Sequence, residues 1–509
     1  TPAPALDLAG VAPQPLTGER RAAFDAYLAG SLAQFGVPGA SVAVVENGAV
    51  VYARGFGVRA LGGTQPVTAD TRFMIGSVTK SMTSLMAATL VDGGWLSWDT
   101  PLHALLPDFR LADPALTNKV TVADSFCACT GIPRHDMPLL FEGDALTPPR
   151  LITSLANVKP TAKPGEKFQY SNQMYAIGGY AATIAAGGSP NDLVRAYRLA
   201  MTDRVLDPIG MTQSSFALED VLASRNYAEP HAAGLDGVTR RVPVLAEDRF
   251  VHSGEPAGGL WSTASDMARY LQTQLAGGVA PDGVRVVSSE NLTRTWTKRV
   301  AMPSPAEPTP LAAAAQGYAM GWITGAWHGQ RLIQHDGSTL GFESQVAMLP
   351  DAGVGVVIVT NGGAGASLFT LAAQYRLFES LYDVPPEIGP LATKAYAAQQ
   401  HLLATYTASL APVDPTAVAP FLGRYHNPEL GDVTLSRQDD DLLLDAGEIR
   451  ASVRRVAGSD PPRYAFTTRP LDNPGINLAL QTGSNGQPQL KLAVGPTGET
   501  YVFDRAAGT

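Results

Sequence analysis

The pattern of hydrophobic residues changes between residues 386 and 415, and this change constrains the fold of the 509-residue chain more than any other feature. Before it, strand-like and helix-like segments are mixed. After it, short alternating segments are separated by Asp, Gly, Pro and Asn turns. A chain of this length exceeds what one hydrophobic core supports. We therefore expect a domain at 1–385, a Pro- and Ala-rich linker with a helical stretch at 386–415, and a domain at 416–509.

Strand patterns occupy both ends of the first domain, and helical patterns fill its middle. Residues 41–58 predict a hairpin around Asn47-Gly48, and residues 330–361 predict further strands. Residues 77–92 carry apolar side chains at helical spacing, and Gly93-Gly94 ends that helix. The expected fold is α+β: one antiparallel sheet built from both ends of the domain and flanked by helices, with a mostly helical subdomain.

The second domain consists of short segments that alternate apolar and polar residues over about 95 residues. Seven segments have this character: VTLSR, DLLLDA, RASVRRVA, RYAFTTR, INLALQ, QLKLAV and TYVFDR. Seven or eight short strands at this spacing predict an antiparallel sandwich or an up-and-down barrel. We expect a small all-β barrel.

Composition excludes several classes of function. The formal net charge is −9 and 16% of the residues are charged, which disfavours binding to nucleic acid or to anionic lipid. No apolar run approaches the roughly 20 residues of a membrane-spanning helix. The chain begins with Thr-Pro-Ala-Pro instead of Met. From this we expect that a secretory signal segment has been removed and that the protein is periplasmic or secreted.

Ser77 and Lys80 are the first candidate catalytic pair. They lie three residues apart at the start of the predicted helix, so their side chains share one face. A serine needs a base to become a nucleophile, and a desolvated lysine can be that base. Lys80 is the only one of the eight lysines that has a serine three residues before it. The same spacing arises by chance in about half of such chains, so the motif alone is weak.

Tyr170 and Asn172 form the second candidate motif, Tyr-x-Asn. A tyrosine beside a lysine can relay a proton to a leaving group. An asparagine there can hold the lysine and hydrogen-bond the substrate. The same motif recurs at Tyr425 and Asn427 within the predicted β domain, where we expect a structural role.

His335 and Gly337 form the third candidate, on a predicted late strand. A strand beside the nucleophile can donate a backbone N–H to the developing oxyanion, and Gly337 would let the substrate approach closely. Similar triplets begin at Lys163 and His252, but only His335 has strand patterns on both sides. Single histidines are more often structural than catalytic, so this motif too needs support from its context.

Cys127 and Cys129 are the only cysteines in the chain, and one residue separates them. In an extended loop both side chains would point to the same side, but so tight a ring strains a disulfide. A metal site would need more ligands than Cys-Ala-Cys supplies. We therefore expect two buried thiols.

The order and spacing of the three motifs resemble the active-site set of the serine β-lactamase and penicillin-binding-protein superfamily, in its class C-like branch. That branch groups class C β-lactamases, DD-peptidases, D-aminopeptidases and esterases. The resemblance covers roughly residues 20–385 through these blocks: FMIGSVTKSMTSLMAATLVDGG, KPGEKFQYSNQMYAIGG, PIGMTQSSF, AGGLWSTASDMARYL and HDGSTLGFESQVAMLPDAGVGVVIVTN. The C-terminal β region resembles the lipocalin-like domain that some peptidase members carry.

The resemblance implies a role for each residue of the first two motifs. Ser77 would be the nucleophile and Lys80 its base. Tyr170 would be the acid/base partner, and Asn172 would position the lysine and the substrate. The implied reaction is acyl transfer through a covalent Ser77 ester followed by hydrolysis, without a cofactor or a metal.

On the strand, the resemblance implies that His335 takes the place of the lysine found in typical β-lactamases. Gly337 would line the site, and the backbone N–H groups of Ser77 and Ser338 would form the oxyanion hole. Histidine at 335 removes a cation that commonly receives the β-lactam carboxylate, and Asp336 adds negative charge nearby. A second departure is Cys-Ala-Cys-Thr-Gly-Ile at 127–132, where the family usually has His-Thr-Ser-Gly-Leu.

These departures and the appended β domain favour peptides over antibiotics. We expect a serine peptidase or amidohydrolase that cleaves short or unusual peptides, including D-residue-containing and linearised cyclic ones. Two alternatives remain open. The first is a carboxylesterase with the same residues, and the second is a non-catalytic penicillin-binding sensor. The expected partner is a small peptide or ester substrate, and the oligomeric state is left open.

Overall fold

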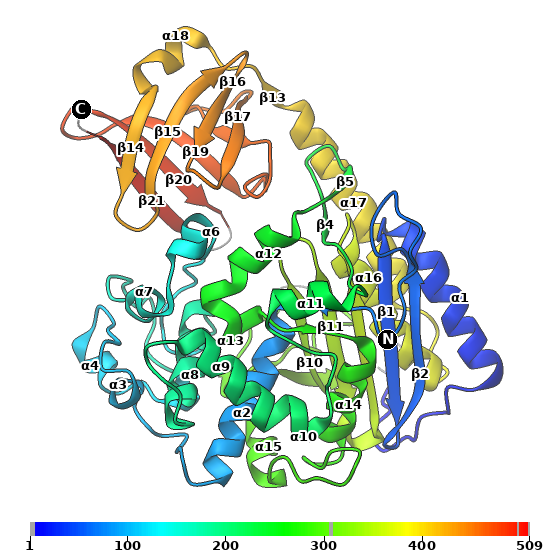
Figure 1. Ribbon diagram of the computed structural model, residues 1–509. Coiled ribbons are helices and arrows are strands. Elements are labelled where there is room, and N and C mark those ends of the chain that lie inside the picture. The colour runs from blue at the N-terminus through cyan, green and yellow to red at the C-terminus, as the bar shows by residue number, and fades with distance from the viewer. Residues whose placement is uncertain (1–5, 305–308, 496–497, 507–509) are drawn as a thin grey trace, which may run out of the picture. The chain divides into compact units, whose positions relative to one another are not determined.

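The computed structural model describes residues 6–304, 309–495 and 498–506 (Figure 1). Residues 1–4, on which the expectation of a removed signal segment rests, lie outside this range. The chain forms two compact units. The first comprises the chain up to Pro133, Thr147–Ala232 and Arg241–Ala395, and the second comprises Arg134–Leu146, Ala233–Arg240 and the chain from Tyr396 onward.

An antiparallel sheet forms the centre of the first unit, with the strand order β2-β1-β12-β11-β10-β9-β8-β7. Its strands are β1 (Gly39–Glu46), β2 (Ala49–Gly57), β7 (Val300–Ala301), β8 (Gly317–Tyr318), β9 (Ile323–Trp327), β10 (Gln330–Ser338), β11 (Glu343–Leu349) and β12 (Val354–Thr360). The N-terminal hairpin therefore pairs with the late strands, through β1 and β12. This confirms the prediction of one sheet built from both ends of the domain.

The hairpin between β1 and β2 turns at Asn47 and Gly48, which both have positive φ (49° and 79°), as a tight two-residue hairpin turn requires. All eight residues of β1 are buried, so both faces of the sheet are covered. Helix α14 (Ala264–Leu275) packs on β1 and β12. Helix α16 (Ala366–Leu381) packs on β11 and β12, and α1 (Gly18–Gln34) packs on α16. The expected flanking helices are therefore present.

Most of the other helices of the first unit lie in the chain between the β1–β2 hairpin and the late strands, and this part of the chain is mostly helical. They are α2 (Thr79–Asp92), α3 (Leu102–Leu105), α4 (Pro114–Thr117), α5 (Val122–Ser125), α7 (Pro148–Thr153), α8 (Asn172–Ala185), α9 (Leu193–Met201), α10 (Asp207–Ile209), α11 (Leu218–Ser224), α12 (Val244–Val251), α13 (Glu255–Gly258) and α15 (Ser289–Trp296). A short 3₁₀ helix, η1 (Gly76–Val78), leads into α2. Within this region α2 packs against α8, α13 and α15.

The second unit is built on an antiparallel β-barrel. Its eight strands are β14 (Gly423–Asn427), β15 (Gly431–Gln438), β16 (Asp441–Asp445), β17 (Arg450–Val456), β18 (Tyr464–Phe466), β19 (Ile476–Thr482), β20 (Pro488–Val494) and β21 (Glu499–Arg505). Pairing of β14 with β21 and of β17 with β18 closes the barrel. Seven strands match the predicted segments, and β14 is the eighth. The more specific likeness to lipocalins stays a prediction.

The barrel core is apolar and includes residues from outside the barrel strands. Met137 and Phe141 of α6 (Met137–Glu142) belong to the same buried cluster as Val433, Leu444 and Leu492. The segment predicted as a linker contains α17 (Ile388–Ala408), β13 (Leu410–Ala411) and α18 (Pro415–Val418).

Candidate active site

Ser77 lies in η1, immediately before helix α2, so the nucleophile candidate is in a 3₁₀ turn and not in the first turn of the α-helix that the sequence predicted. Lys80 is in the first turn of α2 and is only 1% exposed. Its Nζ lies 2.9 Å from Ser77 Oγ and donates to Ala257 O at 2.7 Å. The predicted serine–lysine contact is therefore formed, in a nearly water-free position.

Tyr170, which precedes helix α8, and Asn172, within it, contact the same pair. Asn172 is the first residue of α8, and the Ser171 side chain caps the helix by accepting from Met174 N. Tyr170 OH donates to Ser77 Oγ at 2.9 Å. Lys80 Nζ donates to Asn172 Oδ1 at 2.8 Å and lies 4.8 Å from the centre of the Tyr170 ring. The two motifs, about 90 residues apart, thus converge on one hydroxyl.

His335 lies on β10 and is 2% exposed. Its Nδ1 donates to the backbone carbonyl of Asp336, which leaves Nε2 to accept from Tyr318 OH at 3.0 Å. Burial lowers the pKa of His335 below 6.5; the nearby Asp336 charge opposes this shift, and Lys80 adds to it. The imidazole is therefore neutral near pH 7, and both of its nitrogens are bonded to groups other than Ser77.

Gly337 and Ser338 bring β10 against the turn that carries Ser77. A Cβ at Gly337 would lie 2.0 Å from Ile75 O, so this glycine admits a neighbouring segment of the same chain. Gly76 has a φ of +52°, and a Cβ there would lie 2.8 Å from Ser338 N. Two glycines thus permit the close approach that places the backbone of Ser338 beside Ser77. This arrangement suits an oxyanion hole built from backbone N–H groups.

Glu343 pairs with Ser338 across β10 and β11 and accepts from Ser338 Oγ at 2.8 Å. Burial raises the pKa of Glu343 to about 8; the Ser338 hydrogen bond opposes this shift, while Asp336 and Glu247 add to it. The strand side of the site therefore holds a neutral imidazole and a carboxyl group that retains its proton at neutral pH.

Sequence reasoning missed three contributors to the site: the Ala257 carbonyl, Tyr318 and Glu343. A backbone carbonyl carries no side-chain signal, although Ala257 lies within the AGGLW block. Tyr318 is the second residue of the two-residue strand β8, which pairs with β9, the neighbour of β10, and nothing in its own sequence context marks it. Glu343 could have been found from hairpin register, because it lies on the strand that follows His335.

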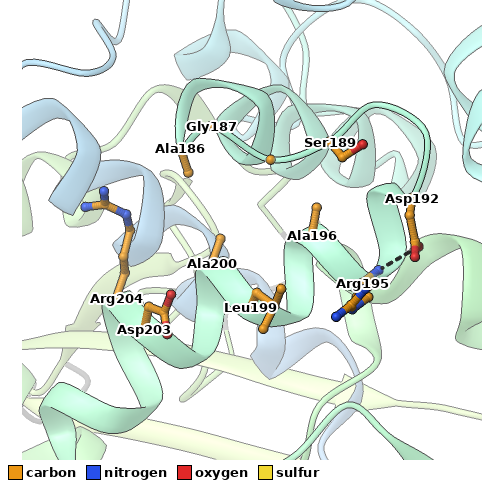
Figure 2. Close-up of a pocket in the computed structure, with 11 residues that line it drawn as sticks. Ala186, Gly187, Ser189, Asp192, Arg195, Ala196, Leu199, Ala200, Asp203 and Arg204 are labelled. Carbon is orange, nitrogen blue, oxygen red and sulfur yellow. Dashed lines mark hydrogen bonds between the residues drawn. The ribbon is translucent and has the colours of Figure 1, made fainter.

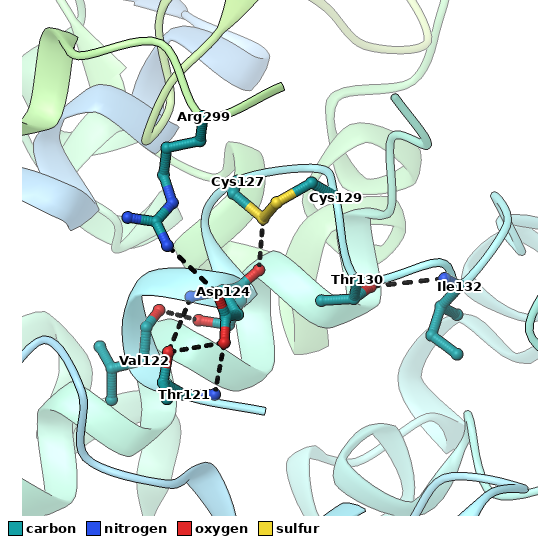
Figure 3. Close-up of a disulfide and its surroundings, with 9 residues drawn as sticks. Thr121, Val122, Asp124, Cys127, Cys129, Thr130, Ile132 and Arg299 are labelled. Atoms are coloured by element: carbon teal, nitrogen blue, oxygen red, sulfur yellow. Dashed lines mark hydrogen bonds and ion pairs between the residues drawn. A yellow bond between two sulfur atoms is a disulfide. The ribbon is translucent and has the colours of Figure 1, made fainter. Parts of the chain in front are cut away.

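The prediction that Cys127 and Cys129 are two thiols is wrong. They form a disulfide, with their Cα atoms 5.1 Å apart (Figure 3). The prediction assumed an extended loop. Instead, Ala128 has a φ of +50°, a backbone conformation outside the extended region. This turn brings the two side chains together.

A cavity lies elsewhere in the first unit, and none of the three motifs lines it. Its volume is about 690 Å³, and it lies beside α9 (Figure 2). Its lining includes Asp192, Arg195, Leu199 and Arg204, and none of the candidate catalytic residues. Over the described ranges, no group of three or more His, Cys, Asp or Glu residues is arranged to hold a metal ion. No helix within those ranges is long and apolar enough to cross a membrane.

A mixed α+β unit with an antiparallel sheet, in which a serine at a helix start contacts a lysine and a tyrosine, defines the β-lactamase-like class of folds. The β-lactamase family profile matches residues 24–379, and the chain belongs to this family. The family assignment made from the motifs is therefore confirmed.

Three relatives are informative. The chain is 30% identical to an unguisins hydrolase of Aspergillus campestris over 70% of its length and 27% identical to one of Aspergillus violaceofuscus over 73%. It spans 64% and 66% of those two proteins. It is 31% identical to penicillin-binding protein 4 of Amycolatopsis lactamdurans, over 66% of this chain and 83% of that protein.

The fold is also similar to that of an octameric penicillin-binding protein homologue from Pyrococcus abyssi. The TM-score is 0.62 at 22% identity, with 95% of this chain and 99% of that chain covered. At this identity the likeness shows the fold alone. Because the coverage is nearly complete, the likeness extends over both the first unit and the barrel unit.

Proposed function

We propose that this protein is a serine hydrolase that forms an acyl-enzyme at Ser77 and cleaves amide bonds of short or unusual peptides, including D-residue-containing and linearised cyclic ones. The observation that carries the proposal is the convergence of Lys80 Nζ and Tyr170 OH on Ser77 Oγ, each at 2.9 Å. Two relatives named as unguisins hydrolases support hydrolysis as the reaction.

In the acylation step, Ser77 Oγ attacks the substrate carbonyl carbon. The serine proton passes to whichever of Lys80 and Tyr170 is deprotonated. Negative charge develops on the carbonyl oxygen, where the N–H groups of Ser77 and Ser338 stabilise it. The C–N bond then breaks, and the leaving amine takes up the proton that Ser77 released, delivered through Tyr170. Asn172 holds Lys80 in place throughout.

In the deacylation step, water attacks the Ser77 ester and gives its proton to the same lysine–tyrosine pair. The carboxylic product leaves and Ser77 Oγ regains a proton, so the enzyme returns to its starting state. His335 lines the strand side as a neutral group, where typical family members place a lysine.

A carboxylesterase is the second candidate. The observation in its favour is the lack of a strand-side cation, since His335 is neutral and Asp336 beside it is exposed and acidic. A substrate that needs no carboxylate anchor, such as a simple ester, suits this strand. The same feature disfavours a penicillin-binding sensor, because penicillins carry a carboxylate.

The test compares wild-type protein with Ser77→Ala. We expect Ser77→Ala to lose turnover and labelling by a fluorophosphonate probe, and Ser189→Ala, an exposed serine outside the site, to retain both. Mass spectrometry of trapped Ser77 identifies the acyl group. Competing kcat/KM values for a peptide panel and matched esters then separate peptidase from esterase. Undiminished turnover by Ser77→Ala would contradict the mechanism.

We also propose that the protein works in an oxidising compartment, the periplasm or the exterior of the cell. Its support is the Cys127–Cys129 disulfide, since structural disulfides persist mainly outside the reducing cytosol. Fractionation of producing cells tests this: we expect the protein in the periplasmic or secreted fraction. Recovery in the cytosol with both thiols reduced would contradict the proposal.

A further inference from the structure

The Cys127–Cys129 disulfide lies in the loop that supports Tyr170. Its two half-cystines are 0% and 6% exposed and share a buried cluster with Tyr318, against which Phe168 and Tyr170 pack. The disulfide is thus part of the wall behind a catalytic side chain, and the catalytic steps proposed above make no use of it.

Backbone hydrogen bonds connect this loop to the segment that leads to Tyr170. Cys129 O accepts from Gly165 N at 2.7 Å, and Ala128 O accepts from Gln169 N at 2.7 Å. Gln169 is the residue immediately before Tyr170. The orientation of the Ala128 peptide therefore bears directly on the position of the Tyr170 backbone.

Ala128 adopts a φ of +50°, a conformation that residues other than glycine rarely adopt. The ring closed by the disulfide contains this residue and restricts its backbone. Little spare room exists nearby: the cavity between Ala128, Tyr170, Lys80 and Tyr318 has a volume of only about 10 Å³. Relaxation of Ala128 would therefore be transmitted to Tyr170 instead of being absorbed by empty space.

We propose that the Cys127–Cys129 disulfide is a positioning element for Tyr170, and that its reduction by a dithiol slows the reaction. In that step the S–S bond breaks, each sulfur gains one electron and one proton, and the dithiol becomes a disulfide. The inference rests on the proposed function, since it acts through the Tyr170–Ser77 contact. A displacement of about 1 Å at such a contact is enough to cost a large factor in rate.

The composition of the chain makes the test specific. Because the sequence has two cysteines, a reductant has one disulfide to act on. The protein is treated with excess dithiothreitol, and thiol alkylation with mass spectrometry verifies the reduction. We expect kcat for a p-nitrophenyl ester to fall about tenfold while KM changes less than about threefold. A double variant, Cys127→Ala with Cys129→Ala, should show the same lowered kcat and no response to dithiothreitol.

Combining this double variant with Tyr170→Phe separates a positioning role from a merely structural one. If the disulfide acts through Tyr170, its loss costs much less in the Tyr170→Phe background than in the wild type. Thermal unfolding of each variant shows that the protein compared is folded. Independent, multiplicative losses would overturn the inference, as would wild-type kcat in both the verified reduced protein and the double variant.

Fluorophosphonate labelling separates this result from the proposed function. If the oxidised protein is labelled at Ser77 and reduction leaves kcat unchanged, only the positioning role fails. If the oxidised protein is not labelled and Ser77→Ala keeps its turnover, the proposed function itself fails.

Discussion

The two sides of the candidate site differ in charge and in bonding. On the helix side, Lys80 is buried and its Nζ contacts Ser77, Asn172 and the Ala257 carbonyl, so its amino group lies at the nucleophile. On the strand side, His335 bonds to Tyr318 and to its own strand, and burial disfavours its charged form. We infer that proton transfer belongs to the helix side, while His335 on the strand side shapes the substrate as a neutral group.

The largest effect we expect is at Lys80. Lys80→Ala removes the amine that contacts Ser77 Oγ and should lower kcat by about 10²–10⁴-fold, the usual contribution of general acid–base catalysis. Steady-state rates on a p-nitrophenyl ester measure this. Lys119→Ala, an exposed lysine, is the control. Near-normal rates in a folded Lys80→Ala protein would show that Lys80 is not the base.

Tyr170→Phe should have the next largest effect, because it removes the hydroxyl that, together with the Lys80 amine, hydrogen-bonds Ser77 Oγ. We expect kcat to fall about 10–10³-fold with little change in unfolding free energy. Tyr425, in the second Tyr-x-Asn motif, is the matched control: its hydroxyl donates to Phe421 O within the barrel unit. Tyr425→Phe should cost about 1 kcal/mol of stability and leave kcat unchanged. Normal kcat in Tyr170→Phe together with a lowered kcat in Tyr425→Phe would contradict the roles given to the two motifs.

The two Tyr-x-Asn motifs show what could be predicted from the sequence alone. Tyr170 and Tyr425 have the same local motif, but their surroundings in the chain differ, a helical pattern for one and a β pattern for the other, and in the structure Tyr170 contacts Ser77 while Tyr425 lies in the barrel. The sheet was also predictable, because the Asn47-Gly48 turn and the late strands have patterns that depend on local backbone geometry. Strand β14 contains Tyr425 and was less visible, because its five residues give only a short alternation.

What could not be predicted depends on contacts between distant segments. The Ala257 carbonyl binds Lys80 through the backbone, which any residue would offer. The neutrality of His335 follows from its burial, and its Nε2 bonds to Tyr318, 17 residues away. The disulfide depends on the positive φ of Ala128, and alanine gives no sign of such a conformation.

His335 should matter less than the helix side. Its pKa lies below 6.5, so its protonation should appear as an acidic limb of the kcat/KM profile below pH 6.5. His335→Gln should remove that limb and lower kcat/KM about tenfold at pH 7.5, less than Lys80→Ala does. His401→Gln, an exposed histidine, should leave the profile unchanged. An acidic limb above pH 6.5 that His335→Gln abolishes would mean that the strand side carries a charge in the working enzyme.

The smallest effect on rate is expected at Glu343, where stability should respond instead. Its pKa is about 8 in the folded protein and near 4.5 when exposed, so the folded state retains a proton that the unfolded state has lost. This contribution to stability is complete below pH 4.5 and is lost as pH rises to about 8, with a slope of at most about 1.4 kcal/mol per pH unit. Urea unfolding followed by tryptophan fluorescence from pH 5 to 9 measures it.

Glu343→Gln should flatten this dependence and change kcat less than about threefold at pH 7, because an amide and a protonated carboxyl can both accept from Ser338 Oγ. Glu290→Gln, an exposed glutamate, should leave the pH dependence of unfolding as in the wild type. If Glu343→Gln and wild-type protein instead showed parallel curves, Glu343 would be ionised in the folded protein. The strand side would then carry a second negative charge in addition to Asp336, and the site would favour substrates with a positively charged group.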